Sequence, residues 1–154
     1  MREPHEIPVS ELVPQAGAMC LLDKVLSADT ETLSAQVTIR ANGLFFHDGA
    51  VGAWVGMEYM AQAIAAWAGW QARQQAQLPK IGFLLGCRRY VSQRPGYTLG
   101  EILHIHVSRQ FQADNGLGQF DCRIEVNQTV VATAALTVFE PSDASLFLEE
   151  MDHG

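Results

Sequence analysis

The stretch FFHDGAVGAWVGMEYMAQAIAAWAGW occupies residues 45–70. From Gly49 to Trp70 its single formal charge is Glu58, and no proline interrupts it. Alanine and methionine favour a helix, and the apolar residues lie on nearly every side of it. The stretch therefore predicts one long helix that other parts of the chain must cover on most sides.

A membrane span is the first alternative for this segment. Ala50–Trp70 has the length of a span, which is about 20 residues. Glu58 would cost about 2.5 kcal/mol or more near a bilayer centre, and Gln62 would add to that cost. The flanking sequence alternates as a water-soluble sheet does. We therefore expect a core helix and no membrane span.

Strand patterns flank the predicted helix on both sides. Apolar and polar residues alternate before it and after it, with the period of two that marks half-buried strands. The expected strands are Cys20–Leu26, Leu33–Ile39, Ile81–Val91, Ile102–Phe111, Gly118–Val126 and Val130–Phe139. Asn115-Gly116 and Asn127-Gln128 are hairpin signals, so the later strands are expected to be sequential and antiparallel. The pattern predicts an α+β domain whose antiparallel sheet curls around the helix.

The chain has the size and composition of one globular domain. It has 154 residues, 48% of them hydrophobic, which allows a sizeable core. We expect a single domain over residues 1–154, with a core from about 13 to 139 and an acidic tail from 141 to 154.

Cysteine usage and the first residues bear on the compartment. Cys20, Cys87 and Cys122 are far apart and form no CxxC pair, so neither a disulfide framework nor a zinc knuckle is expected. Met1 to Glu11 is polar and acidic rather than signal-like. These features favour a cytoplasmic protein with free thiols.

The charge is unevenly distributed. The net charge of −7 argues against nucleic-acid binding. Between Arg73 and Arg109, however, there are six basic residues and one acidic residue, Glu101. This basic segment indicates either contact with an anionic partner or ordinary solvated strand faces.

Glu58 and Gln62 are four residues apart, so they share a helix face. Ala61, Ala65 and Gly69 make that face narrow. A carboxylate in apolar surroundings favours its protonated form, which can act as a general acid. The alternative is a core glutamate satisfied by hydrogen bonds to Gln62 or to a loop.

His47 lies just before the helix, in a segment from Phe46 to Gly52 that is expected to be a loop. An imidazole there is a candidate general base at neutral pH, although a lone loop histidine is as often merely exposed. Backbone N–H groups at a helix start can also polarise a carbonyl oxygen.

His104 and His106 form a second cluster, on one face of a predicted strand. Their spacing suits a metal, but a third ligand is lacking nearby. We expect exposed polar residues and no metal site.

The motifs resemble those of the hotdog-fold β-hydroxyacyl-acyl carrier protein dehydratases, and within them the aryl-polyene (ApeP-like) branch. The resemblance extends over Val13–Phe139. Four segments carry it, and the one that begins at Glu58 is the most specific. Val13–Val25 is similar to the family's Leu-Pro-His-Arg…Leu-Leu-x-Asp-Arg-Val entry, and Phe45-Phe-His47 is similar to its histidine loop. Glu58-Tyr-Met-Ala-Gln62 is similar to its Glu-Ala-x-Ala-Gln helix, and Arg94-Pro-Gly96 is similar to its Arg-Pro…Pro-Gly-Asp turn. Asp48-Gly49 stands where the family has Phe-Pro, and Gln15-Ala16 where it has His-Arg.

The resemblance implies a fold and a reaction. It implies a hotdog fold and dehydration of a 3-hydroxyacyl thioester to a trans-2-enoyl thioester, with His47 as base and Glu58 as acid. A backbone N–H near Ala53 or Trp54 would hold the thioester oxygen, and Gln62 would lie against the substrate.

The resemblance also implies partners. The substrate would ride on the phosphopantetheine of an acyl carrier protein, with no other cofactor. Arg88, Arg89 and Arg94 would contact this acidic partner. The site would form at a homodimer interface. A hotdog thioesterase and a non-catalytic acyl-binding or dimerisation module are the alternative functions.

Overall fold

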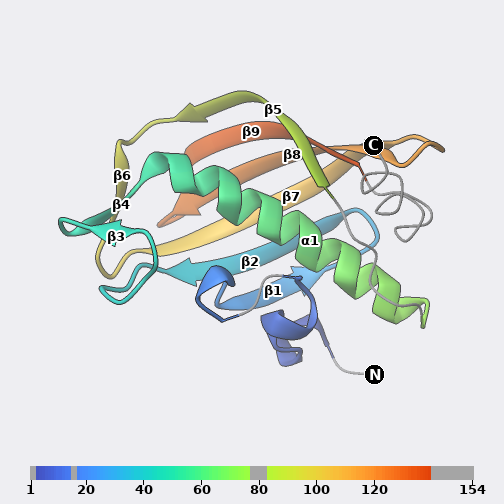
Figure 1. Cartoon of the computed structure of the whole chain (residues 1–154), viewed down its shortest axis with the longest axis horizontal. Coiled ribbons are helices and arrows are strands. Elements are labelled where there is room, and N and C mark those ends of the chain that lie inside the picture. Colours follow the sequence, from blue (N-terminus) through green and yellow to red (C-terminus); the bar gives the residue numbers. More distant parts are fainter. Residues whose placement is uncertain (1–2, 15–16, 77–82, 140–154) are drawn as a thin grey trace, which may run out of the picture.

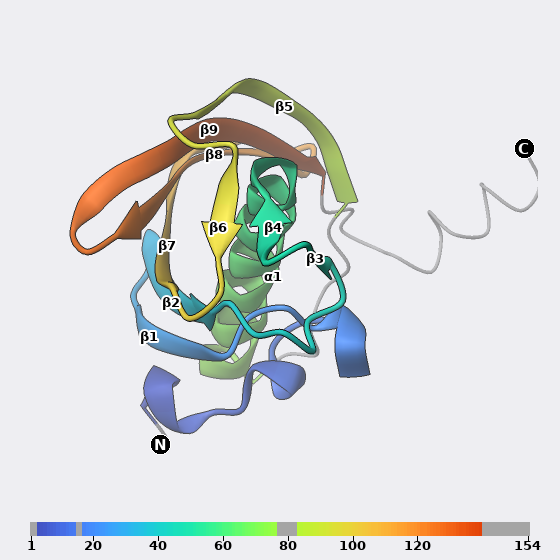
Figure 2. The ribbon, with the colours of Figure 1, turned by 90° about the vertical axis from the view of Figure 1, so that its left-hand side faces the viewer.

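The computed structural model describes residues 3–14, 17–76 and 83–139. A six-stranded antiparallel sheet curves around one long helix, α1 (Gly56–Gln74), in the strand order β1-β2-β7-β8-β9-β5. Figure 1 shows α1 lying across the sheet, and Figure 2 shows the sheet wrapping it. The strands are β1 (Lys24–Ala28), β2 (Thr32–Thr38), β5 (Phe83–Ser92), β7 (Ile102–Gln112), β8 (Leu117–Val126) and β9 (Thr129–Phe139). The expected α+β fold with a sheet around a helix is confirmed.

The sheet follows the alternation of the sequence. On β7, Leu103, Ile105 and Val107 are buried against the helix, while His104 and His106 lie on the outer face. Asn127 and Gln128 both have positive φ, at 51° and 67°, and join β8 to β9 as a two-residue turn. This geometry is the type I′ hairpin, whose twist matches that of the strands.

A second, smaller sheet lies at the start of the helix. Its order is β3 (Phe46–His47), β4 (Ala50–Gly52) and β6 (Gly96–Thr98), and Figure 2 shows it in front of α1. The expected loop from Phe46 to Gly52 is therefore wrong, because Asp48-Gly49, with φ of 51° and 83°, closes a tight hairpin.

The described residues before β1 pack into the core. Ile7, Val9 and Leu12 are buried in the core. A Cβ at Gly69 would overlap the Leu12 carbonyl, so glycine lets the two backbones touch. The core thus begins near residue 7, earlier than the expected 13. The acidic tail from 141 lies outside the described residues.

Candidate functional site

Gln62 anchors the site to the helix. Among the described residues it is the one amide or charged side chain that is fully buried, with 0% exposed. Its Oε1 accepts the Leu21 N–H at 2.8 Å, and its Nε2 donates to the Met19 carbonyl at 2.8 Å and to Glu58 Oε1 at 3.1 Å. Both amide ends are satisfied, so the side chain is fixed between the helix and the entering chain.

Glu58 is held by Gln62, as one of the sequence-based alternatives expected, yet it is only half-buried. It lies on a helix stripe whose members are all half-buried or exposed. The stripe consists of Trp54, Met57, Glu58, Ala61, Ala65 and Ala68. The apolar surroundings predicted for Glu58 are therefore incomplete in a single chain. They would be completed by a substrate or a partner lying along this stripe.

The turn that leads into α1 is a 3₁₀ helix, Ala53–Val55. The Ala53 N–H donates to the Pro95 carbonyl at 2.9 Å, so it is already used. The Ala53 carbonyl accepts from the Tyr90 hydroxyl and from the Gly56 N–H. Of the two predicted oxyanion donors, this leaves the Trp54 N–H.

The Trp54 side chain lies on the surface, 64% exposed, with its ring edge-on to Phe45 at 5.4 Å between centroids. A large exposed aromatic residue beside a half-open helix is typical of a contact surface.

His47 lies on the hairpin that precedes the helix. It sits on β3 with its side chain 88% exposed, and its Nε2 is 3.2 Å from Asp48 Oδ2. Within the described chain, His47 and Glu58 share no hydrogen bond or ion pair. The predicted base and acid therefore make no direct polar contact with each other within the described residues.

Three tyrosines behind the turn were missed by sequence reasoning. Tyr59 and Tyr97 are buried, and Tyr90 is half-buried. Burial raises the pKa of Tyr59 to about 12, and it also raises the pKa values of Tyr90 and Tyr97. All three phenols therefore stay protonated at neutral pH and can donate hydrogen bonds. The close approach at Gly56, where a Cβ would overlap the Tyr90 hydroxyl, becomes visible only in the structure.

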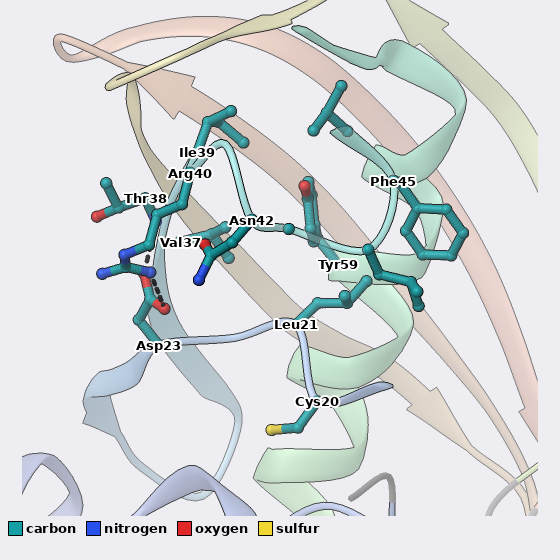
Figure 3. Close-up of a pocket in the computed structure, with 13 residues that line it drawn as sticks. Cys20, Leu21, Asp23, Val37, Thr38, Ile39, Arg40, Asn42, Phe45 and Tyr59 are labelled. Atoms are coloured by element: carbon teal, nitrogen blue, oxygen red, sulfur yellow. Dashed lines mark hydrogen bonds and ion pairs between the residues drawn. The ribbon is translucent and has the colours of Figure 1, made fainter. Parts of the chain in front are cut away.

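A cavity of about 200 Å³ lies beside the helix, at the end of β2 (Figure 3). Tyr59, Cys20 and Phe45 contribute to its wall, and Asp23 forms an ion pair with Arg40 there at 2.7 Å. Glu58, Gln62 and His47 do not line it. The cavity is therefore separate from the predicted catalytic residues.

Comparison with known proteins identifies the family. The sequence model of the ApeP-like family, described as ApeP dehydratase, matches residues 7–149. The chain belongs to the ApeP-like dehydratases. It is accordingly a hotdog-fold dehydratase, a lyase.

Solved structures agree with this assignment. The dehydratase heterocomplex ApeI:P from Xenorhabdus doucetiae contains a chain that is 30% identical, with a TM-score of 0.84, over 92% of this chain and 96% of that one. A chain of a dehydratase complex is thus matched along nearly its whole length.

More distant structures share the fold only. A hypothetical thioesterase with coenzyme A from Streptococcus pneumoniae is 14% identical, with a TM-score of 0.60, over 76% of this chain and 84% of that one. The PaaI protein of E. coli is 18% identical, with a TM-score of 0.59, over 75% and 80%. No curated protein sequence is similar to the chain.

The basic segment of this ApeP-like dehydratase is partly neutralised. Arg94 donates to Glu101 through both terminal guanidinium nitrogens, and Arg109 forms an ion pair with Glu31. Arg88 and Arg89 are exposed on β5, the edge strand of the large sheet, and form no ion pair with described residues. Of the three predicted carrier contacts, these two are open to a partner.

Two further expectations concern metal and membrane. Across the described ranges, no group of histidine, cysteine and acidic residues is arranged to hold a metal ion. His106 instead contacts Ser34 at 2.6 Å and Glu125 at 2.6 Å on the outer face of the sheet. In the same part of the chain, no helix combines the length and apolarity needed to cross a bilayer.

Proposed function

We propose that this dehydratase removes water from a 3-hydroxyacyl thioester carried on the phosphopantetheine of an acyl carrier protein, and needs no other cofactor. The observation that carries the proposal is the fixed Gln62–Glu58 pair on an otherwise apolar, half-open helix face. Gln62 holds the carboxyl group in one place, where a substrate along the stripe would meet it. Such fixed placement of an acid is what general acid catalysis requires.

In the proposed reaction the α-proton leaves C2 and the hydroxyl leaves C3. His47 takes the C2 proton, and Glu58 gives its proton to the departing hydroxyl, forming water and the trans-2 double bond. The Trp54 N–H stabilises the charge that develops on the thioester oxygen. The His47 imidazolium then releases the C2 proton and the Glu58 carboxylate takes one up, so the enzyme ends unchanged.

The open surfaces support an assembly of two hotdog chains. The half-open helix stripe and the unpaired edge of β5 both lie uncovered in one chain. A second chain over them would bury the apolar stripe and supply a histidine from its own loop. The partner is a second copy or, by analogy with the ApeI:P heterocomplex, a related dehydratase chain. Arg88 and Arg89 would receive the acidic carrier protein.

The exposure of His47 favours a second candidate, in which this chain supplies only Glu58 to a composite site and the partner chain supplies the base. The thioesterase alternative gains no support beyond shared fold, because the thioesterase relatives are too distant in sequence.

The test is turnover of a 3-hydroxyacyl carrier protein by the purified chain, followed by the ultraviolet absorbance of the conjugated enoyl thioester and by mass. We expect water loss without release of free thiol. Glu58→Gln keeps the contact to Gln62 but cannot give up a proton in this way, and should lower kcat about 1,000-fold. Release of free acid and thiol would instead identify a thioesterase. Absence of any turnover, alone or with a related dehydratase chain added, would contradict the proposal.

A further inference from the structure

We propose that Tyr90 is a positioning residue for the reaction: its hydroxyl orients and polarises the Ala53–Trp54 peptide, whose N–H faces the developing oxyanion. This inference rests on the proposed function and deepens it. It concerns a residue on β5, far along the chain from Glu58 and from the helix start. Tyr90 does not touch the substrate, and it acts through a backbone group.

The geometry of one peptide unit carries the inference. The Ala53 carbonyl and the Trp54 N–H belong to the same peptide, and the two groups point in opposite directions. The Tyr90 hydroxyl donates to that carbonyl, and the Gly56 N–H donates to it as well. Holding the oxygen toward the sheet therefore turns the N–H away from the sheet.

Two donors on the carbonyl also change its electronic character. Hydrogen bonds in a chain polarise one another, so a carbonyl that accepts two bonds makes its own N–H a stronger donor. A preorganised donor of this kind is what stabilises charge in a transition state. Tyr90 would thereby act on the thioester oxygen without meeting it.

The neighbouring peptide is fixed too. The Ala53 N–H donates to the Pro95 carbonyl at 2.9 Å, and Gly52 pairs with Gly96 on β6. Both peptides that flank the Ala53 α-carbon are thus tied to the segment from β5 to β6. The turn cannot rotate its N–H away without breaking contacts to that segment.

The sequence keeps room for the tyrosine at this point. A Cβ at Gly56 would overlap the Tyr90 hydroxyl and lie 3.1 Å from the Tyr97 hydroxyl. Tyr97 is fully buried, and its hydroxyl approaches that of Tyr90 without the alignment of a well-formed hydrogen bond. Arg94 lies over the Tyr97 ring, 5.7 Å from its centroid. The tyrosine hydroxyls therefore form a packed support under the turn.

The deciding experiment is Tyr90→Phe in the full chain, which removes one oxygen and keeps the ring. We expect kcat for 3-hydroxyacyl carrier protein to fall about 10-fold with KM within about twofold, the pattern of an interaction made in the transition state. The carbonyl stretch of a bound 2-enoyl thioester should move toward its frequency in water, because the Trp54 N–H polarises it less.

Tyr59→Phe is the matched control. Its hydroxyl makes no hydrogen bond within the described chain, and it lines the separate cavity. We expect kcat and the carbonyl stretch to match wild type. Equal values for Tyr90→Phe and wild type in both measurements would overturn the inference while leaving the proposed function standing. An inactive wild type would overturn the proposed function and the inference together.

Gly56→Ala provides a second route to the same peptide. Its methyl group would displace the Tyr90 hydroxyl while leaving the tyrosine in place. We expect the same loss of kcat and the same spectral shift. The double variant Gly56→Ala with Tyr90→Phe should have a higher melting temperature than Gly56→Ala alone. A purely structural tyrosine would lower the melting temperature and leave the carbonyl stretch of the folded enzyme unchanged.

Discussion

The two sides of the proposed site are built in opposite ways. On the helix side, Gln62 fixes Glu58, and the support under the turn fixes the Ala53–Trp54 peptide. On the hairpin side, His47 stands 88% exposed at a tight turn, with the equally exposed Asp48 beside it. The acid and the oxyanion donor are therefore fixed within one chain, and the base is not.

This difference indicates which side of the proposed site a second chain would order. A side chain surrounded by water pays conformational entropy when it is ordered, so an exposed base is poorly preorganised. Covering the hairpin with a second chain would order His47, or would replace it with a histidine of the partner. The helix side needs covering only to exclude water. Substitutions that break the anchoring contacts of the helix side should therefore change folding, whereas substitutions on the hairpin side should change activity alone.

Gln62→Leu should have the largest effect on folding. It removes three hydrogen bonds and leaves the Met19 carbonyl and the Leu21 N–H without their side-chain partner. Leaving buried polar groups unpaired should lower the free energy of unfolding by about 3 kcal/mol. Urea unfolding of the variant and of the wild type measures this difference in free energy.

Gln71→Leu is the control for Gln62→Leu on the same helix. Its side chain makes one exposed bond, to the Asp29 carbonyl at 2.8 Å. We expect a loss below about 1 kcal/mol. Equal losses for the two variants would show that Gln62 is not a special anchor of the entering chain.

His47→Ala tests the open side. If His47 is the base, kcat should fall about 100-fold, while the melting temperature stays unchanged because the side chain is exposed. The measurement is enoyl thioester formation by the assembled enzyme. His5→Ala, at another exposed histidine paired with an acid, should leave kcat unchanged. Full activity of His47→Ala would assign the base to the partner chain.

The long strands and the helix were predictable because their signals are periodic. On β7, apolar residues alternate over a strand of 11 residues, and Asn127-Gln128 marks the following hairpin. A segment of this length contains enough alternating residues to identify a strand. The resemblance then gave the fold family, because the Glu58–Gln62 motif lies on the helix where that family has it.

The short strands and the tyrosine support were not predictable in the same way. β3 has two residues and β4 has three, too few to show a period. The Asp48-Gly49 dipeptide is the only turn signal there, and a dipeptide alone fits a loop as well as a hairpin. Tyr90 reads as an ordinary strand residue in sequence. Its hydrogen bond to Ala53 depends on tertiary packing, which one sequence does not reveal.

Glu101→Gln tests what supports the helix side, and we expect it to lower the free energy of unfolding less than Gln62→Leu does. Glu101 binds the Arg94 guanidinium and accepts the Thr98 N–H at 2.7 Å. These contacts hold the segment whose Pro95 carbonyl accepts the Ala53 N–H. At pH 7 we expect a loss of about 2 kcal/mol in the free energy of unfolding. Glu31→Gln, at a more exposed pair with Arg109, should lose less than about 1 kcal/mol.

The pH dependence separates an ion pair from simple packing. The hydrogen bonds from Arg94 lower the pKa of Glu101 from 4.5 to about 2 in the folded protein. The unfolded chain therefore binds the proton first, so the stabilisation is present above about pH 4.5 and is lost as the pH falls toward about 2. The difference between wild type and Glu101→Gln should shrink across that range. A difference that stays constant from pH 7 to the acid limit would mean that the carboxylate charge does not hold the turn, and that shape alone keeps the helix side fixed.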